Sequence, residues 1–81
     1  MAKLYFRNSY GNEELCGIGN ITEKNVVRTV LNELANRNPS YVSHYQRTWR
    51  NDAGELWIDV GSWDEFYILR DFEGGDDNGE S

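Results

Sequence analysis

The chain has 81 residues and a formal net charge of −6, from 8 basic and 14 acidic side chains. This length allows one small domain rather than a two-domain enzyme. No stretch approaches the ~20 apolar residues that a membrane span needs. The acidic balance disfavours a general nucleic-acid binder, because such domains usually carry net positive charge.

The charge is unevenly distributed along the chain. Residues 1–50 contain seven basic and four acidic residues, a net +3, whereas residues 51–81 contain one basic and ten acidic residues, a net −9. From Glu73 onward the residues are small, polar or acidic, a composition that does not form a packed core. We therefore expect a single domain over residues 1–72 and a disordered acidic tail over residues 73–81.

Few residues have the chemistry of a metal, disulfide or catalytic site. Cys16 is the only cysteine and His44 the only histidine, so neither an intramolecular disulfide nor a cysteine zinc site is expected. We expect no catalytic residues, no metal and no cofactor, and predict that the protein is not an enzyme. The start of the chain runs directly into a strand pattern with no apolar leader, which favours a cytoplasmic location.

The first elements in the chain are predicted as two antiparallel strands. Apolar and polar residues alternate over residues 3–8, and a weaker strand pattern covers residues 13–18. The intervening residues 8–12 are rich in Asn, Ser and Gly, which is typical of a turn.

A helix is predicted next. Thr22 is a good N-cap, and Ile21 and Val26 occupy the two positions of a hydrophobic staple. Five apolar residues follow at helical spacing: Val26, Val27, Val30, Leu31 and Leu34. Asn36 or Asn38 can end the helix, and Pro39 prevents its continuation.

Three further strands are predicted over residues 41–50, 55–60 and 65–70, with a hairpin loop at residues 51–54. The resulting ββαβββ order predicts an α+β fold, an antiparallel β-sheet with one helix packed on one face. Pairing across the hairpin loop sets Trp49 opposite Leu56, on the side facing the helix. The same register also sets Arg47 opposite Ile58 and Tyr45 opposite Val60. The reverse face then carries His44, Thr48, Arg50, Glu55, Trp57 and Asp59.

The turn after residue 59 allows two geometries. A two-residue turn at Gly61 and Ser62 would set Asp59 directly opposite Asp64, a destabilising pair unless an arginine, a metal or a basic partner lay beside it. A looser loop would instead place Asp59 beside Phe66. Solvated surface acids remain the simplest alternative to a functional site.

The acidic stretch also contains aromatic residues, and we interpret it as a candidate partner-binding surface because aromatic anchors in a charged field are typical of interfaces. The candidate residues are Asp59, Trp63, Asp64, Glu65, Phe66, Tyr67 and Asp71. A solubilising role is the alternative. A second alternative is an aromatic platform for single-stranded nucleic acid on the sheet, built from Tyr5, Trp57 and Tyr67 with Arg7, Arg47 and Arg50.

Three segments together carry a family resemblance: LYFRNSYG at residues 4–11, SHYQRTW at residues 43–49 and DVGSWDEF at residues 59–66. They resemble a group of short phage and prophage proteins of Gram-positive bacteria. The resemblance covers about residues 4–70 and leaves the acidic tail unmatched. It carries no activity, and implies that the motif residues specify turns and sheet packing.

Small phage proteins of this kind commonly bind host proteins. We therefore expect a protein of the host bacterial cytoplasm that binds and inhibits or modulates a host or defence protein with a basic surface, as an anti-CRISPR protein does. Such a protein can act by nucleic-acid mimicry. Direct nucleic-acid binding is disfavoured by the acidic second part. A homo-oligomeric structural or accessory phage protein remains an alternative, and the oligomeric state stays open.

Overall fold

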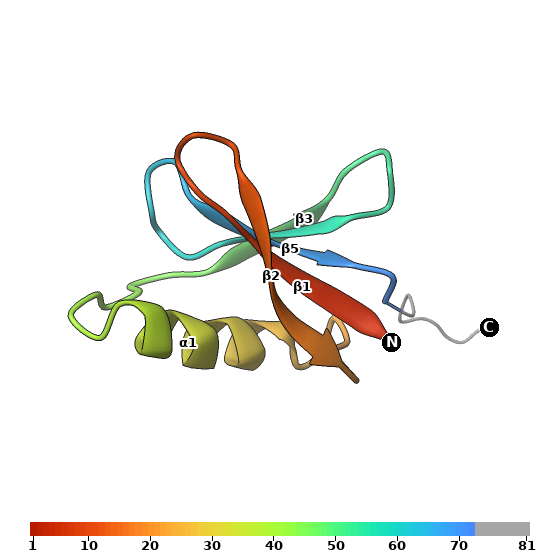
Figure 1. The fold of residues 1–81 in the computed structure, drawn as a ribbon, viewed down its shortest axis with the longest axis horizontal. Coiled ribbons are helices and arrows are strands. Elements are labelled where there is room, and N and C mark those ends of the chain that lie inside the picture. Colours follow the sequence, from red (N-terminus) through yellow and green to blue (C-terminus); the bar gives the residue numbers. More distant parts are fainter. Residues whose placement is uncertain (73–81) are drawn as a thin grey trace.

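A computed structural model describes residues 1–72 of the chain. It contains a five-stranded antiparallel sheet with the strand order β2-β1-β5-β4-β3 and one helix on one face (Figure 1). The predicted α+β class and ββαβββ order are therefore confirmed. The tail predicted for residues 73–81 lies outside the described residues.

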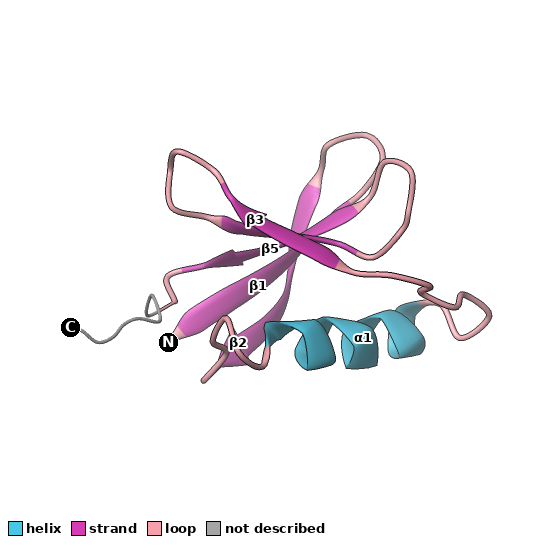
Figure 2. Cartoon of the chain, turned by 180° about the vertical axis from the view of Figure 1, so that it is seen from behind, coloured by secondary structure: helices cyan, strands magenta, loops and turns pink. Residues whose placement is uncertain are grey.

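The elements are β1 (Ala2–Arg7), β2 (Glu13–Gly19), α1 (Val26–Arg37), β3 (Arg47–Arg50), β4 (Leu56–Asp59) and β5 (Phe66–Arg70). The central strand β5 pairs with both β1 and β4, so the first and last strands of the domain lie side by side. Figure 2 shows that the helix runs along only one side of the sheet.

The hydrophobic core lies between the helix and this side of the sheet. Every second residue of β1, β4 and β5 contributes to it, as expected for strands with one face turned inward. These strand residues are Ala2, Leu4, Phe6, Leu56, Ile58, Tyr67 and Leu69. The helix adds Val26, Val30 and Leu34, which are spaced four residues apart and so share one face.

The helix begins later than predicted, because Asn25 and not Thr22 is the N-cap. Thr22 instead closes the preceding turn: its hydroxyl accepts a hydrogen bond from the Lys24 amide at 3.2 Å, and its carbonyl accepts one from the Val26 amide at 2.9 Å. The helix ends at Arg37, and the Asn38 amide donates to the Leu34 carbonyl at 2.8 Å, so the predicted end is confirmed.

The strand predicted over residues 41–50 is shorter in the structure and covers only Arg47–Arg50. The preceding residues have no ladder partner, because β4 ends at Asp59, opposite Arg47. Side chains attach this segment to the sheet instead. The hydroxyls of Tyr41 and Ser43 both donate to the Val60 carbonyl at 2.9 Å.

The predicted pairing of β3 with β4 is wrong by one residue. Trp49, expected opposite Leu56, pairs with Trp57, and Arg47 pairs with Asp59. A slip of one residue exchanges the two faces of a strand. Trp49 and Arg47 therefore lie on the face away from the helix, not toward it.

The loop between β3 and β4 sets the observed register. The Asn51 side-chain oxygen accepts hydrogen bonds from the amides of Ala53 and Glu55 at 3.1 and 2.9 Å, and the Asn51 amide donates to the Glu55 carbonyl at 3.1 Å. Asn51 rather than Arg50 thus lies opposite Glu55, and the loop is shortened to residues 52–54. Thr48 and Arg50, expected on the reverse face, consequently lie on the helix side of the sheet, paired with core positions of β4.

Candidate functional site

The face of the sheet away from the helix is covered by long side chains. Its central residue, Ile68, is fully buried although no second helix of residues 1–72 packs there. Ile68 pairs with Tyr5 and Trp57 on the two neighbouring strands. The Arg70 guanidinium lies 4.7 Å from the centre of the Tyr5 ring, and that of Arg7 lies 5.7 Å from the Trp57 ring. Arginine stems and aromatic rings thus replace a second layer.

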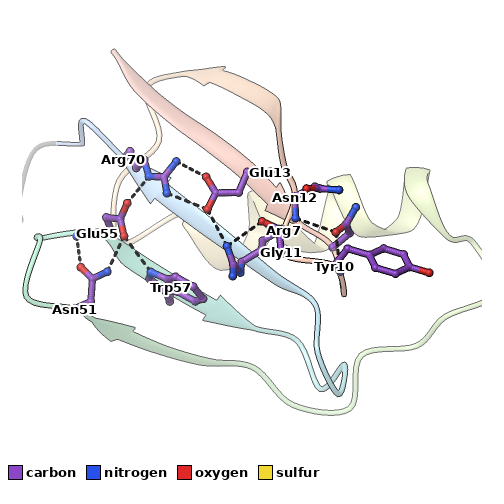
Figure 3. Close-up of polar contacts among 10 residues, drawn as sticks. Arg7, Tyr10, Gly11, Asn12, Glu13, Asn51, Glu55, Trp57 and Arg70 are labelled. Atoms are coloured by element: carbon purple, nitrogen blue, oxygen red, sulfur yellow. Dashed lines mark hydrogen bonds and ion pairs between the residues drawn. The ribbon is translucent and has the colours of Figure 1, made fainter.

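Ion pairs hold this cover in place (Figure 3). Arg70 donates to both carboxylate oxygens of Glu13, at 2.8 and 3.2 Å, and also to the Glu55 carboxylate. Arg7 donates to Glu13 at 3.3 Å, and the Trp57 indole donates to Glu55 at 3.3 Å. The network joins β1, β2, β4 and β5 across the open face, while β3 lies outside it.

The same contacts change the acidity of the two glutamates. The hydrogen bond from Arg70 holds the pKa of Glu13 below its usual value. Hydrogen bonds from Asn51 and then from Arg70 do the same for the pKa of Glu55. Both carboxylates therefore stay ionised and matched by arginine charge, so this network stabilises the sheet and leaves little net charge for a ligand.

An aromatic cluster occupies the β3 side of the open face. The Trp49 and Trp57 rings are stacked with centroids 6.2 Å apart, and Phe66 lies 6.0 and 5.6 Å from them. The platform predicted from Tyr5, Trp57 and Tyr67 does not form, because Tyr67 lies on the opposite face, in the core. Trp49 was missed as a platform residue. It lies on the open face because the observed register pairs it with Trp57.

A second group of aromatic residues lies at one end of the sheet. The loop at residues 8–12, the loop at residues 60–65 and the segment at residues 41–46 all lie at this end, because Arg7 pairs with Phe66 and Arg47 with Asp59. Trp63 is 95% exposed, more than any other large hydrophobic residue in the described chain. We call this region the aromatic loop surface and define it by Tyr10, Tyr45, Trp63, Asp64 and Glu65.

The loop that carries Trp63 has a fixed start. One carboxylate oxygen of Asp59 accepts the Gly61 amide at 2.8 Å, and the other accepts the Arg47 guanidinium at 3.0 Å. Gly61 has a φ of +89°, and a Cβ there would lie 3.2 Å from the Tyr41 hydroxyl, so this turn requires glycine. The loop that presents Trp63 to solvent is therefore anchored at its start.

Three of the predicted partner-binding residues lie together in this loop: Trp63, Asp64 and Glu65. Phe66 is half-buried against Trp57 on the open face. Asp71 follows the far end of β5, where its carboxylate lies 3.5 Å from the Lys3 ammonium. The structure thus divides the predicted surface between the two ends of β5.

The two remaining residues are buried, which corrects their predicted surface position. Tyr67 is 1% exposed and belongs to the core, and Asp59 is 4% exposed and paired with Arg47. Asp59 does not oppose Asp64, because Ile58 pairs with Tyr67 and leaves the longer of the two loops that the sequence allowed. The acidic surface is consequently smaller than predicted.

Tyr10 and Tyr45 were missed as candidates, and only the topology brings them to the end of the sheet where Trp63 lies. Tyr10 is 88% exposed in the turn after β1, where the Asn8 side-chain oxygen accepts its amide at 2.9 Å. Tyr45 is half-exposed, and its ring would lie 3.5 Å from a Cβ on Gly61. The Asn-Ser-Tyr-Gly turn was a usable signal for Tyr10, because turn tips face solvent.

A pocket of about 250 Å³ opens beside the aromatic loop surface, between the end of the helix and the loop at residues 60–65. Its walls include Phe6, Leu34, Arg37, Ser62, Glu65 and Tyr67. The Tyr67 hydroxyl is buried without a well-aligned hydrogen bond among the described residues. Burial, followed by the Glu33 charge, raises the pKa of Tyr67 to about 12, so the phenol is neutral at physiological pH.

Comparison with known proteins finds no match to a family model, a curated protein or a solved structure. Within residues 1–72, no group of three or more His, Cys, Asp or Glu side chains is arranged to hold a metal ion. The one helix of this region lacks the length and apolar character needed to cross a bilayer. The arrangement of the exposed side chains therefore carries the functional argument.

Proposed function

We propose that the chain is a non-enzymatic protein-binding domain that contacts its partner through the aromatic loop surface. The observation that carries this proposal is the 95% exposure of Trp63 in a loop whose start is anchored by the Asp59 carboxylate. A tryptophan in water forgoes a large gain from burial, and tryptophan and tyrosine are enriched among the residues that dominate binding energy.

The charges of this surface favour a basic partner. Asp64 is exposed, and Glu65 lies beside it with a long 3.4 Å contact from the Ser62 hydroxyl. The other predicted acids contribute less, because Asp59 and Asp71 are paired with Arg47 and Lys3. Complementary charge speeds association and selects the partner, while the aromatic residues supply affinity.

The resemblance to phage and prophage proteins extends this proposal. It favours a host or defence protein as the partner, including a nucleic-acid-binding nuclease with a basic groove, and the host bacterial cytoplasm as the location. Inhibition or modulation of that partner is the expected effect.

The proposal is tested by affinity capture from host lysate with the full chain as bait. A specific partner is expected to be captured by the wild type, lost with a Trp63→Ala, Asp64→Lys double variant, and weakened at high salt. Leu15→Ala is the matched control, because Leu15 is 47% exposed on β2, away from this surface. Capture of the same partner by the double variant, or failure of the wild type to capture any specific partner, would contradict the proposal.

A second function is favoured by one observation on the open face. Trp49 is 39% exposed, and the exposed Arg47 guanidinium lies 5.8 Å from the centre of its ring, an arrangement on which a nucleobase can stack. A gel shift at low salt with a labelled oligothymidine tests single-strand binding. A shift that Trp49→Ala removes would favour this function over protein binding, and no shift at micromolar protein would exclude it.

A further inference from the structure

The pocket beside the aromatic loop surface presents opposite polarities on two walls. On the helix side, Arg37 and Tyr67 supply donor groups. On the loop side, the Glu65 carboxylate supplies an acceptor, and Ser62 lies next to it. Apolar groups of Phe6 and Leu34 line the remainder, so the pocket suits a short aliphatic stem with a polar head.

The Tyr67 hydroxyl is the group that most requires a ligand. Its residue is 1% exposed, and its oxygen has no well-aligned hydrogen bond among the described residues. The neighbouring Arg37 guanidinium can only donate to this oxygen, so the hydroxyl hydrogen has no acceptor there. Buried polar atoms of native proteins are normally partnered, and a partner missing from the free protein can be supplied by a bound group. Tyr67 is one of the residues that line the pocket, so a group bound there can supply the missing acceptor.

The charges around Arg37 exclude two kinds of polar head. Its guanidinium already donates to Glu33 at 2.9 Å and to Glu14 at 3.3 Å, and it lies 4.0 Å from the centre of the Phe6 ring. A carboxylate ligand would add a further negative charge beside these glutamates and Glu65. An ammonium ligand would approach the Arg37 cation and leave the Tyr67 donor unmatched.

We propose that this pocket receives a primary amide on a short aliphatic stem, as in a glutamine side chain of the protein partner. The amide oxygen accepts from the Tyr67 hydroxyl, and the amide nitrogen donates to the Glu65 carboxylate. The inference rests on the proposed protein-binding function, since it assigns the partner side chain that lies next to Trp63. A neutral head with both a donor and an acceptor is what the two walls match.

The test uses the free full-length chain and three small probes that differ only in their polar head: butyramide, butyrate and butylamine. We expect butyramide to shift the nitrogen–proton NMR resonances of Arg37, Asn38 and Glu65 in a saturable way, with the other probes at least about fivefold weaker, the value of one hydrogen bond. Tyr67→Phe should weaken butyramide binding by about the same factor. Tyr10→Phe, outside the pocket, should not change it.

Equal effects of the three probes, no saturation by butyramide, or unchanged binding in Tyr67→Phe would overturn the assignment. Because the probes need no partner, the result is independent of the capture experiment. Trp63→Ala is expected to leave butyramide binding intact while removing partner capture, so failure of the pocket and failure of the protein-binding proposal are separately visible.

Discussion

Asp59 is paired with Arg47 across β3 and β4 at 3.0 Å, with the carboxylate side chain 6% exposed and the guanidinium side chain 67% exposed. The two partners therefore differ in what they lose when the pair is broken. The arginine returns to water at little cost, whereas the carboxylate stays inside with the Gly61 amide as its remaining donor.

Arg47→Ala should accordingly lower the free energy of unfolding by about 1–2 kcal/mol at pH 7, because it leaves a buried charge without its counterion. In an Asp59→Asn background the same substitution should cost less, since a neutral amide does not need the guanidinium. Urea unfolding of the four proteins measures this double-mutant cycle. Additive effects of the two substitutions would contradict the proposed coupling.

The open-face network predicts a dependence of stability on pH. Glu13 and Glu55 have pKa values held below 4.5, chiefly by Arg70 for Glu13 and by Asn51 and Arg70 for Glu55. Their contribution to stability is therefore fully present above about pH 4.5 and is lost as the pH falls through their folded-state values. Urea unfolding between pH 7 and pH 3 checks this decline.

The matched variant for this test is the double substitution Glu13→Gln, Glu55→Gln. It should be less stable than the wild type at pH 7 and should lose less further stability on acidification. Parallel pH profiles of the variant and the wild type would show that other carboxylates carry the acid sensitivity.

Tyr67 and Tyr41 should respond in opposite ways to loss of the hydroxyl. Tyr67→Phe removes a buried hydroxyl that lacks a well-aligned hydrogen bond, and it should leave stability unchanged or raise it by up to about 1 kcal/mol. Tyr41→Phe removes the donor to the Val60 carbonyl and should lower stability by about 0.5–1.5 kcal/mol. Thermal and urea unfolding measure both, and a large loss in Tyr67→Phe would mean that its hydroxyl is bonded after all.

Cys16 should react slowly in the native protein. Burial, followed by the Glu33 charge, raises the pKa of its thiol to about 11 from the usual 9.0. Little of it is thiolate near neutral pH, and the thiolate is the reactive form. Alkylation by iodoacetamide at pH 8 should be at least about tenfold slower in the native chain than in urea. Equal rates would show that the thiol is exposed.

The fold class followed from residue patterns that distinguish a helix from a strand. The apolar stripe from Val26 to Leu34 has helical spacing, and the alternation in residues 3–8 and 65–70 defines strands with one inward face. These periodicities arise because one face of each element is buried, and the structure buries those faces in the core. The length of β3 did not follow, because a strand ends where its neighbour ends, and Asp59 terminates β4.

The register of β3 could not be derived from alternation, because a pattern of period two fits equally well after a shift of one residue with exchanged faces. The Asn51 side chain decides between the two, since it closes the loop at Glu55 through two backbone amides. The same uncertainty in register affected the prediction of the candidate site. Trp63 was placed correctly in the loop, whereas Asp59 became buried once Arg47 lay opposite it.

The three tryptophans provide optical reporters of separate parts of the molecule. Trp49 and Trp57, stacked across β3 and β4, should give an exciton couplet in the far-ultraviolet circular dichroism that disappears when this hairpin separates. Trp63, fully hydrated, should emit at longer wavelength and shift to shorter wavelength when a surface covers it. Unfolding of the sheet and occupation of the loop can therefore be followed in the same unlabelled sample.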